Sequence, residues 1–179
     1  MTKRTTSALT LKWTAQKEAD GYLIYGNRCG KTNKLQLVST IEKKSTNKWT
    51  AKKLKRATYY KFMVVAYKNV DDAKMPIAAS VVMHAPTKGS SLTVAKSLKL
   101  SKTKVSLKVG KSIKIKAKEV KEEAKFKIKA HRPVKFESSD PSVVEVDKKG
   151  KIKAKKAGKC KIFAYAQNGV FKTVNVTVK

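Results

Sequence analysis

The chain has 179 residues, and its 43 lysines and arginines against 12 acids give a formal net charge of +31. Hydrophobic residues make up 41% of the chain, which is enough for two modest cores and excludes wholesale disorder. No stretch approaches the roughly 20 apolar residues of a membrane helix, so membrane insertion is not expected. The length suits two domains of about 80–100 residues each.

The positive charge follows the pattern of β-strands. Lysines alternate with apolar residues in Lys111–Lys118 and Lys151–Ala154, which places them on one face of a strand. Residues 1–87 hold 17 basic and 5 acidic residues, and residues 88–179 hold 26 and 7. DNA-binding domains gather their basic residues on one patch. The even spread therefore does not predict a nucleic-acid partner, whereas an anionic glycan or wall polymer stays open as one.

Residues 1–87 contain period-two runs separated by turn residues, which predicts an all-β segment. The runs are Ala8–Trp13, Tyr22–Tyr25, Lys34–Val38, Tyr60–Ala66 and Ile77–Met83. Trp13 and Trp49 are expected in the core of this segment. The stretch Pro86–Ser91, with Pro, Gly and Ser, marks a domain boundary.

The second half alternates in the same way and predicts a second sandwich. Its runs are Val105–Val109, Ile113–Ala117, Val134–Phe136, Val143–Val146, Lys151–Ala154, Cys160–Ala164 and Val174–Val178. Asn168-Gly169 between two runs predicts a two-residue hairpin with positive φ at both positions. The charged segment Lys118–Lys125 is expected to be a loop between strands.

The first segment resembles a fibronectin type III domain. Leu11–Trp13 is similar to the second-strand tryptophan pattern of that family, and Ala19–Tyr25 is similar to the third strand. Leu54–Ala66 is similar to the approach to the sixth strand. This resemblance implies that Tyr60 is the corner tyrosine whose hydroxyl bonds back to the backbone. Almost nothing precedes Leu9, so the first strand is expected to be short or absent.

The second segment resembles a group 2 bacterial Ig-like domain. The similarity rests on Phe136–Val143 followed by Val146–Gly158, with Phe136 where the family usually has tryptophan. The expected fold is all-β, with two Ig-like or fibronectin III-like sandwiches in tandem. The expected domains are residues 1–87 and 101–179, with residues 88–100 as a linker and the strand that enters the second sandwich.

No catalytic, metal or cofactor site is expected. His84 and His131 lie in different segments, no set of nucleophile, base and orienting residue follows from the sequence, and no CxxC pair is present. The two cysteines, Cys29 and Cys160, permit one disulfide. That bridge would require the two domains to fold back side by side, and a buried thiol at Cys160 is the open alternative.

Two groups of residues are candidates for binding a partner. Alternation places Cys160, Ile162 and Ala164 inward and Phe163 and Tyr165 outward. Phe171 joins these two aromatics among lysines, as an interface would use them. The second group is Asn69, Val70, Asp71 and Asp72, in the loop Lys68–Met75 that is expected to join the last two strands of the first sandwich.

The tandem of resemblances implies a monomeric, non-catalytic recognition or adhesion module of Gram-positive gut bacteria. The module would be secreted or attached to the cell wall, and the N-terminus looks like the cut edge of a larger exported protein. The resemblance implies a host protein as partner, with the immunoglobulin variable domain as its most specific form. The alternatives are a structural stalk held to anionic wall polymers and binding of acidic glycan or nucleic acid by charge alone.

Overall fold

The computed structural model describes residues 1–179 and contains only β-strands, so the expected all-β fold class is confirmed. The chain divides into two compact units. Unit 1 comprises Met1–Thr93 with Lys125–Lys127, and unit 2 comprises Val94–Ala124 with Ile128–Lys179. None of the elements is a helix that could span a membrane.

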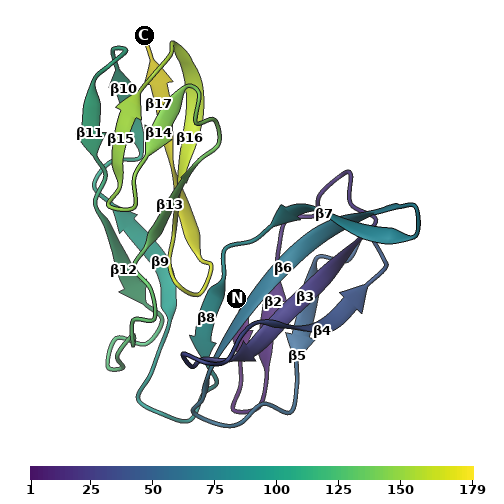
Figure 1. Ribbon diagram of the computed structural model, residues 1–179. Coiled ribbons are helices and arrows are strands. Elements are labelled where there is room, and N and C mark those ends of the chain that lie inside the picture. Colours follow the sequence, from purple (N-terminus) through teal and green to yellow (C-terminus); the bar gives the residue numbers. More distant parts are fainter. The chain divides into compact units, whose positions relative to one another are not determined.

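Unit 1 is a sandwich of two antiparallel sheets (Figure 1). The smaller sheet has the order β1-β2-β5 and the larger one β4-β3-β6-β7, with β8 also paired to β6. The strands are β1 (Lys3–Arg4), β2 (Leu9–Lys12), β3 (Gly21–Arg28), β4 (Gln36–Ile41), β5 (Lys48–Ala51), β6 (Tyr59–Val70), β7 (Ala73–Ala79) and β8 (Met83–Pro86). The first strand is present but only two residues long, as the sequence indicated.

Alternate residues of these strands form the core of unit 1. Leu9 and Leu11 are fully buried from the smaller sheet, and Ile24 and Phe62 are buried from the larger one. Both tryptophans were expected in this core; each is half-buried, and their rings pack on the buried residues Tyr22 and Phe62.

The tyrosine corner is present. The Tyr60 hydroxyl accepts a hydrogen bond of 2.9 Å from the backbone N–H of Lys55, five residues upstream. This bond was implied by the resemblance to fibronectin type III domains, and the structure confirms it.

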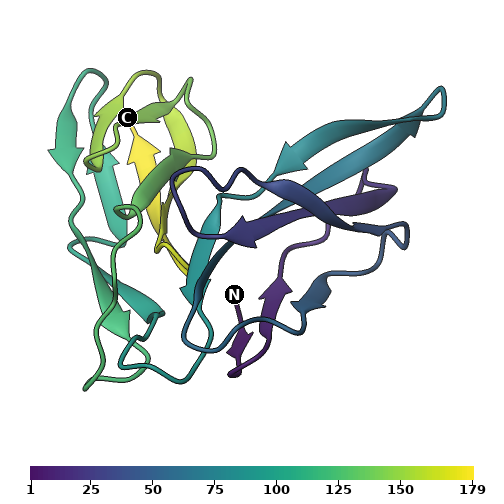
Figure 2. The ribbon, with the colours of Figure 1, turned by 60° about the horizontal axis from the view of Figure 1, so that its bottom comes forward.

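The connection between β6 and β7 is shorter than the sequence indicated. The expected loop Lys68–Met75 is strand for most of its length, with pairs from Val65↔Ala79 to Val70↔Ala73. Only Asp71 and Asp72 lie between the strands, and both have positive φ, 47° and 63°, as a type I′ turn requires. The hairpin extends beyond the neighbouring strands of unit 1 (Figures 1 and 2). The turn therefore lies inside the expected loop, and aspartate adopts its positive φ without glycine.

Unit 2 is a second sandwich. One sheet has the order β10-β17-β16-β13, and β11-β15-β14 and β12-β9 form the opposite layer as two short sheets. The strands are β9 (Ala95–Leu100), β10 (Lys104–Leu107), β11 (Ser112–Lys114), β12 (Ala117–Lys121), β13 (Lys135–Ser138), β14 (Val144–Val146), β15 (Lys151–Ala154), β16 (Gly158–Tyr165) and β17 (Phe171–Val178). All pairs are antiparallel except β10 with β17.

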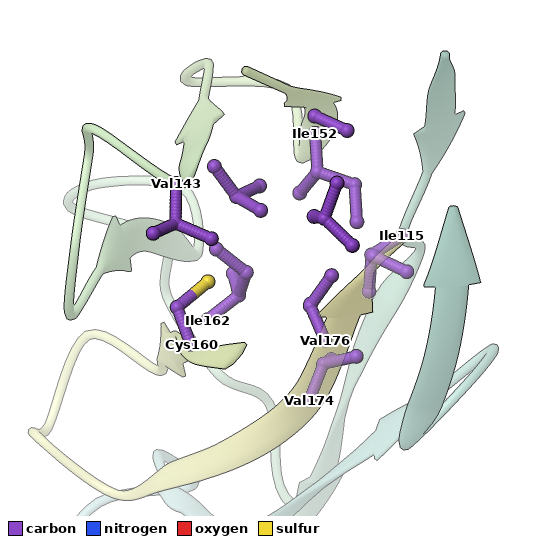
Figure 3. Packing of buried hydrophobic residues seen from close by; sticks show 10 residues of the cluster. Ile115, Val143, Ile152, Cys160, Ile162, Val174 and Val176 are labelled. Carbon is purple, nitrogen blue, oxygen red and sulfur yellow. The ribbon is translucent and has the colours of Figure 1, made fainter. Parts of the chain in front are cut away.

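The core of unit 2 is built from small aliphatic side chains that face one another across the two layers (Figure 3). Its members include Ile115, Val144, Ile152, Ile162, Val174 and Val176, all at most 1% exposed. Phe136 is half-buried and packs against this cluster and against a smaller one around Leu98.

Two aspartates stabilise turns within the segment Phe136–Gly158. Asp140 Oδ1 accepts hydrogen bonds from the backbone N–H and the hydroxyl of Ser142, at 3.0 and 2.6 Å. Asp147 Oδ1 accepts the backbone N–H groups of Lys149 and Lys151, at 2.8 and 2.9 Å. These carboxylates satisfy backbone donors at the ends of strands, so they serve the fold rather than a catalytic site.

Two local predictions for unit 2 were wrong. Lys118–Lys125 was expected to be a loop, yet β12 occupies Ala117–Lys121 and pairs with β9. The hairpin at Asn168-Gly169 has a three-residue loop, because Ala166 and Val170 still bond to each other and only Gly169 has positive φ, 84°. Asn168 is instead buried, and its side chain donates to the Ala95 carbonyl at 2.8 Å.

Candidate recognition surfaces

Three aromatic rings form a cluster on the outer face of unit 2. Phe163 and Tyr165 lie on β16, and Phe171 lies on β17 opposite Tyr165. The ring centroids are 6.0 Å apart for Phe163–Tyr165, 6.0 Å for Phe163–Phe171 and 5.5 Å for Tyr165–Phe171. We call these three residues the aromatic cluster.

The local sequence places the rings outward because the alternate residues fill the core. Ile162, Ala164 and Ala166 are fully buried, whereas Phe163 and Tyr165 are half-buried and Phe171 is 51% exposed. The face predicted from alternation is therefore the face that the structure has. Its role in binding stays a prediction.

Charged groups surround the aromatic cluster. On the neighbouring strand β13, Lys135 pairs with Tyr165 and Glu137 with Phe163, and the Lys135 ammonium lies 2.8 Å from the Glu137 carboxylate. Burial raises the pKa of the Tyr165 hydroxyl, and the Glu137 charge raises it further. The Tyr165 hydroxyl therefore stays neutral at physiological pH, and the surface combines apolar rings with a charged rim.

The backbone behind the cluster is fixed by an arginine that sequence reasoning did not single out. Arg132 donates from Nη2 to the Ala166 carbonyl at 2.9 Å and from Nη1 to the Tyr165 carbonyl at 3.3 Å. The loop after β16 is also tied by Gln167, which accepts the His131 N–H and donates to the Lys129 carbonyl. These hydrogen bonds fix the short loop between β16 and β17, and this loop sets the position of the two strands that carry the rings.

The second group of candidate residues lies at the tip of the β6–β7 hairpin of unit 1. Val70 is 48% exposed, Asp71 and Asp72 form the turn, and the Asn69 N–H donates to the Asp20 carboxylate at 2.8 Å. The structure brings these four residues together, and it leaves the exposed apolar residues Met75 and Ile77 beside them on β7.

Sequence reasoning missed an apolar row on the larger sheet of unit 1. Leu37, Tyr25 and Met63 are paired across β4, β3 and β6, on the face opposite the core residue Ile24. Leu37 is 53% exposed, and the other two are half-buried. Alternate residues of Tyr22–Tyr25 point to opposite faces of the sheet. The outward face of this run is apolar, as its core face is, and this pattern was the sequence signal for the row.

The two cysteines are free thiols in different environments. Cys160 is 7% exposed and belongs to the core of unit 2, where its sulfur lies among aliphatic side chains (Figure 3). A bridge from Cys160 would need this side chain to leave the core, so its position favours the buried-thiol alternative. The Cys29–Cys160 bridge itself stays a prediction.

Cys29 is placed beside a histidine that the sequence did not connect with it. Its Sγ lies 3.4 Å from His84 Nδ1. Burial raises the pKa of the Cys29 thiol to about 11, although the Lys61 charge opposes this shift. The thiol is therefore neutral at physiological pH, which is the opposite of an activated nucleophile.

Residues 94–178 match the family model of the bacterial Ig-like domain (group 2). This match covers nearly all of unit 2 and confirms the resemblance drawn from Phe136–Gly158. No curated protein matches the chain.

Two solved structures are similar to the chain at low identity. The FN1–FN3 domains of chicken CNTN1 are 13% identical, with a TM-score of 0.37 over 98% of this chain and 63% of that one. The C-terminal 282-residue fragment of intimin, in complex with the intimin-binding domain of the translocated intimin receptor, is 12% identical, with a TM-score of 0.34 over 99% and 62%. The chain thus spans less than two thirds of the length of either structure.

Proposed function

We propose that the chain is a non-catalytic recognition module of an exported bacterial surface protein and binds a host protein through the aromatic cluster. The match of residues 94–178 to a bacterial Ig-like family supports a bacterial surface module. The most specific form of this proposal is an immunoglobulin variable domain as partner, which comes from the resemblance of the tandem. We further propose that residues 1–87 and 101–179 act as separate domains, with residues 88–100 as the linker and the strand that enters the second sandwich.

The observation that carries the proposal is the cluster of three aromatic rings on the outer face of a lysine-coated protein, with Phe171 51% exposed and Phe163 and Tyr165 half-buried. Sheet faces that meet water favour polar residues, and the same β16 face carries Lys159 and Lys161. Aromatic side chains are enriched at the centres of protein interfaces, where a few of them supply most of the binding energy. Phe171, with half its surface exposed, would be the anchor that enters a pocket of the partner.

The lysines and the β6–β7 hairpin have supporting roles in this proposal. The net charge of +31 would speed the encounter with an acidic partner without determining its identity. Asn69, Val70, Asp71 and Asp72 form a protruding turn that offers a second contact, and its carboxylates would meet basic groups of the partner.

A binding titration tests the proposal. The chain is immobilised and titrated with immunoglobulin Fab fragments in 50 and 150 mM salt. Phe171→Ser should weaken binding by about tenfold or more, mainly through faster dissociation, because an anchor residue typically contributes 2 kcal/mol or more. Leu37→Ser is the matched control, since Leu37 is 53% exposed and lies in unit 1; it should leave the affinity unchanged.

Salt separates the proposal from binding by charge alone. An interface with an apolar centre should lose mainly association rate between 50 and 150 mM salt, whereas charge-driven binding should fall steeply in affinity. Absence of Fab binding, together with no binding of other host proteins to the wild-type chain, would contradict the proposal and favour a spacer. Equal affinities of Phe171→Ser and wild type would exclude the aromatic cluster as the contact.

A further inference from the structure

The outer face of the smaller sheet of unit 1 carries a hollow of about 360 Å³ that none of the features above uses. Its polar lining consists of four threonines and two lysines: Thr2, Thr5, Thr10, Thr50, Lys3 and Lys48. We call it the threonine–lysine hollow. No carboxylate lines it.

Strand pairing places these side chains on one face. Lys3 pairs with Thr10 across β1 and β2, and Thr10 pairs with Thr50 across β2 and β5. Leu9 and Leu11 alternate with Thr10 and are fully buried, so Thr10 points to the other face of the sheet, where it is 8% exposed. The Thr10 and Thr50 hydroxyls hydrogen-bond to each other at 3.0 Å, which fixes the floor of the hollow.

The next row of the same face brings two like charges together. Lys12 pairs directly with Lys48 across β2 and β5. Like charges directly opposite each other destabilise a sheet. Lys12 lies next to the hollow rather than in its lining, and a bound anion at Lys48 would relieve this repulsion.

The acids of unit 1 do not neutralise these lysines, because they have other partners. Glu18 pairs with Lys68 and Glu42 with Lys74. Asp20 accepts the Asn69 N–H, and the remaining two acids form the β6–β7 turn. The hollow therefore presents ammonium groups and hydroxyls without a competing carboxylate.

We propose that the threonine–lysine hollow binds a phosphate or sulfate group carried by a hydroxylated polymer, such as a polyol phosphate or a sulfated glycan. Lysine binds such oxyanions as a point charge. The Thr2 and Thr5 hydroxyls donate to the Thr10 and Ala8 carbonyls, and Thr10 and Thr50 bond to each other, which leaves one hydroxyl donor for the anion. The hydroxyl oxygens keep acceptor lone pairs for hydroxyl groups of the polymer. A volume of about 360 Å³ is at the small end of ligand pockets and suits one repeating unit. The inference is independent of the protein partner proposed above, since it concerns unit 1 alone.

The site predicts a difference between two pairs of lysines with the same charge. Lys99 and Lys118 are directly opposed, across β9 and β12 of unit 2, and neither lines the hollow. The double variant Lys3→Gln/Lys48→Gln, which removes both lysines that line the hollow, and the control Lys99→Gln/Lys118→Gln therefore remove equal charge. Thr50→Val removes one hydroxyl of the floor at constant charge and nearly constant shape.

The full chain is titrated at 150 mM salt with poly(glycerol phosphate), heparan sulfate and neutral dextran. We expect the first pair of substitutions to weaken binding about tenfold and Thr50→Val about fivefold, whereas the control pair changes it less than about twofold. The polymer that binds more tightly identifies phosphate or sulfate as the group, and dextran should not bind. Equal losses in both lysine pairs, an unchanged Thr50→Val, or no binding of either anionic polymer would overturn the proposal. Thermal unfolding of each variant confirms that it is folded.

Discussion

The Tyr60 hydroxyl is the clearest case in which one atom stabilises the fold of unit 1. Its hydrogen bond with the Lys55 N–H links the segment that precedes β6 to the strand itself. Tyr60→Phe keeps the ring, which is buried, and removes only the hydroxyl. We expect a loss of about 1–2 kcal/mol in the free energy of unfolding, because the Lys55 N–H loses its acceptor. Urea unfolding measures this, and Tyr25→Phe on the outer face serves as the control with little effect.

A second single residue, Asp147, makes the stability of unit 2 sensitive to acidic pH. Hydrogen bonds from the Lys151 and Lys149 backbone N–H groups and the neighbouring lysine charges lower the pKa of the Asp147 carboxyl. A carboxyl with a lowered pKa in the folded state stabilises that state above its unfolded pKa, near 3.8. This contribution is lost as the pH falls from about 3.8 through the folded pKa.

The corresponding experiment compares wild type with Asp147→Asn. Thermal unfolding midpoints between pH 5 and pH 2.5 should fall less in the variant than in the wild type, because the substituted side chain has no charge to lose. An equal fall in both proteins would show that Asp147 does not contribute to the acid sensitivity.

Among the elements, the β6–β7 hairpin gives a test of the backbone geometry. Asp71 and Asp72 both have positive φ, which Asn-Gly adopts at lower cost. The double substitution Asp71→Asn/Asp72→Gly should therefore raise the free energy of unfolding by about 0.5–1 kcal/mol. Denaturant titration checks this, and a lower stability in the variant would contradict the type I′ turn.

Sequence patterns predicted most of the strands because most have one buried face, although β7 is exposed along its whole length. β16 shows this best, since Cys160, Ile162 and Ala164 alternate with residues that face outward. β5 was missed because Lys48–Ala51 is short and only Trp49 marks it. The predicted strand Ile77–Met83 was wrong as one element, since β7 ends at Ala79 and β8 begins at Met83. The apolar pattern continues through the gap between β7 and β8. The gap is revealed only by the pairing, in which β7 and β8 bind different parts of β6.

For the recognition surfaces, alternation was sufficient for Phe163 and Tyr165, because they are two residues apart on one strand. The threonine–lysine hollow could not be predicted, since it combines residues from β1, β2 and β5 whose register the sequence does not specify. The contact between Cys29 and His84 was missed for the same reason, as the two residues are 55 positions apart.

For the whole molecule, charge and specificity have different origins. The lysines lie on the outward faces of both units, as the opposed pairs Lys12↔Lys48, Lys99↔Lys118 and Lys114↔Lys151 show. Such a surface attracts anions of many kinds. The aromatic cluster is one place where this pattern stops, and we propose it as the surface for protein recognition.

Hydrogen–deuterium exchange of the full chain with and without a bound Fab fragment tests this assignment most directly. We expect slower exchange in the segment from Lys159 to Thr173, which contains the aromatic cluster, and unchanged exchange at the β1-β2-β5 sheet. Protection confined to the lysine-rich strands, or none in the segment around Phe163, Tyr165 and Phe171, would contradict it.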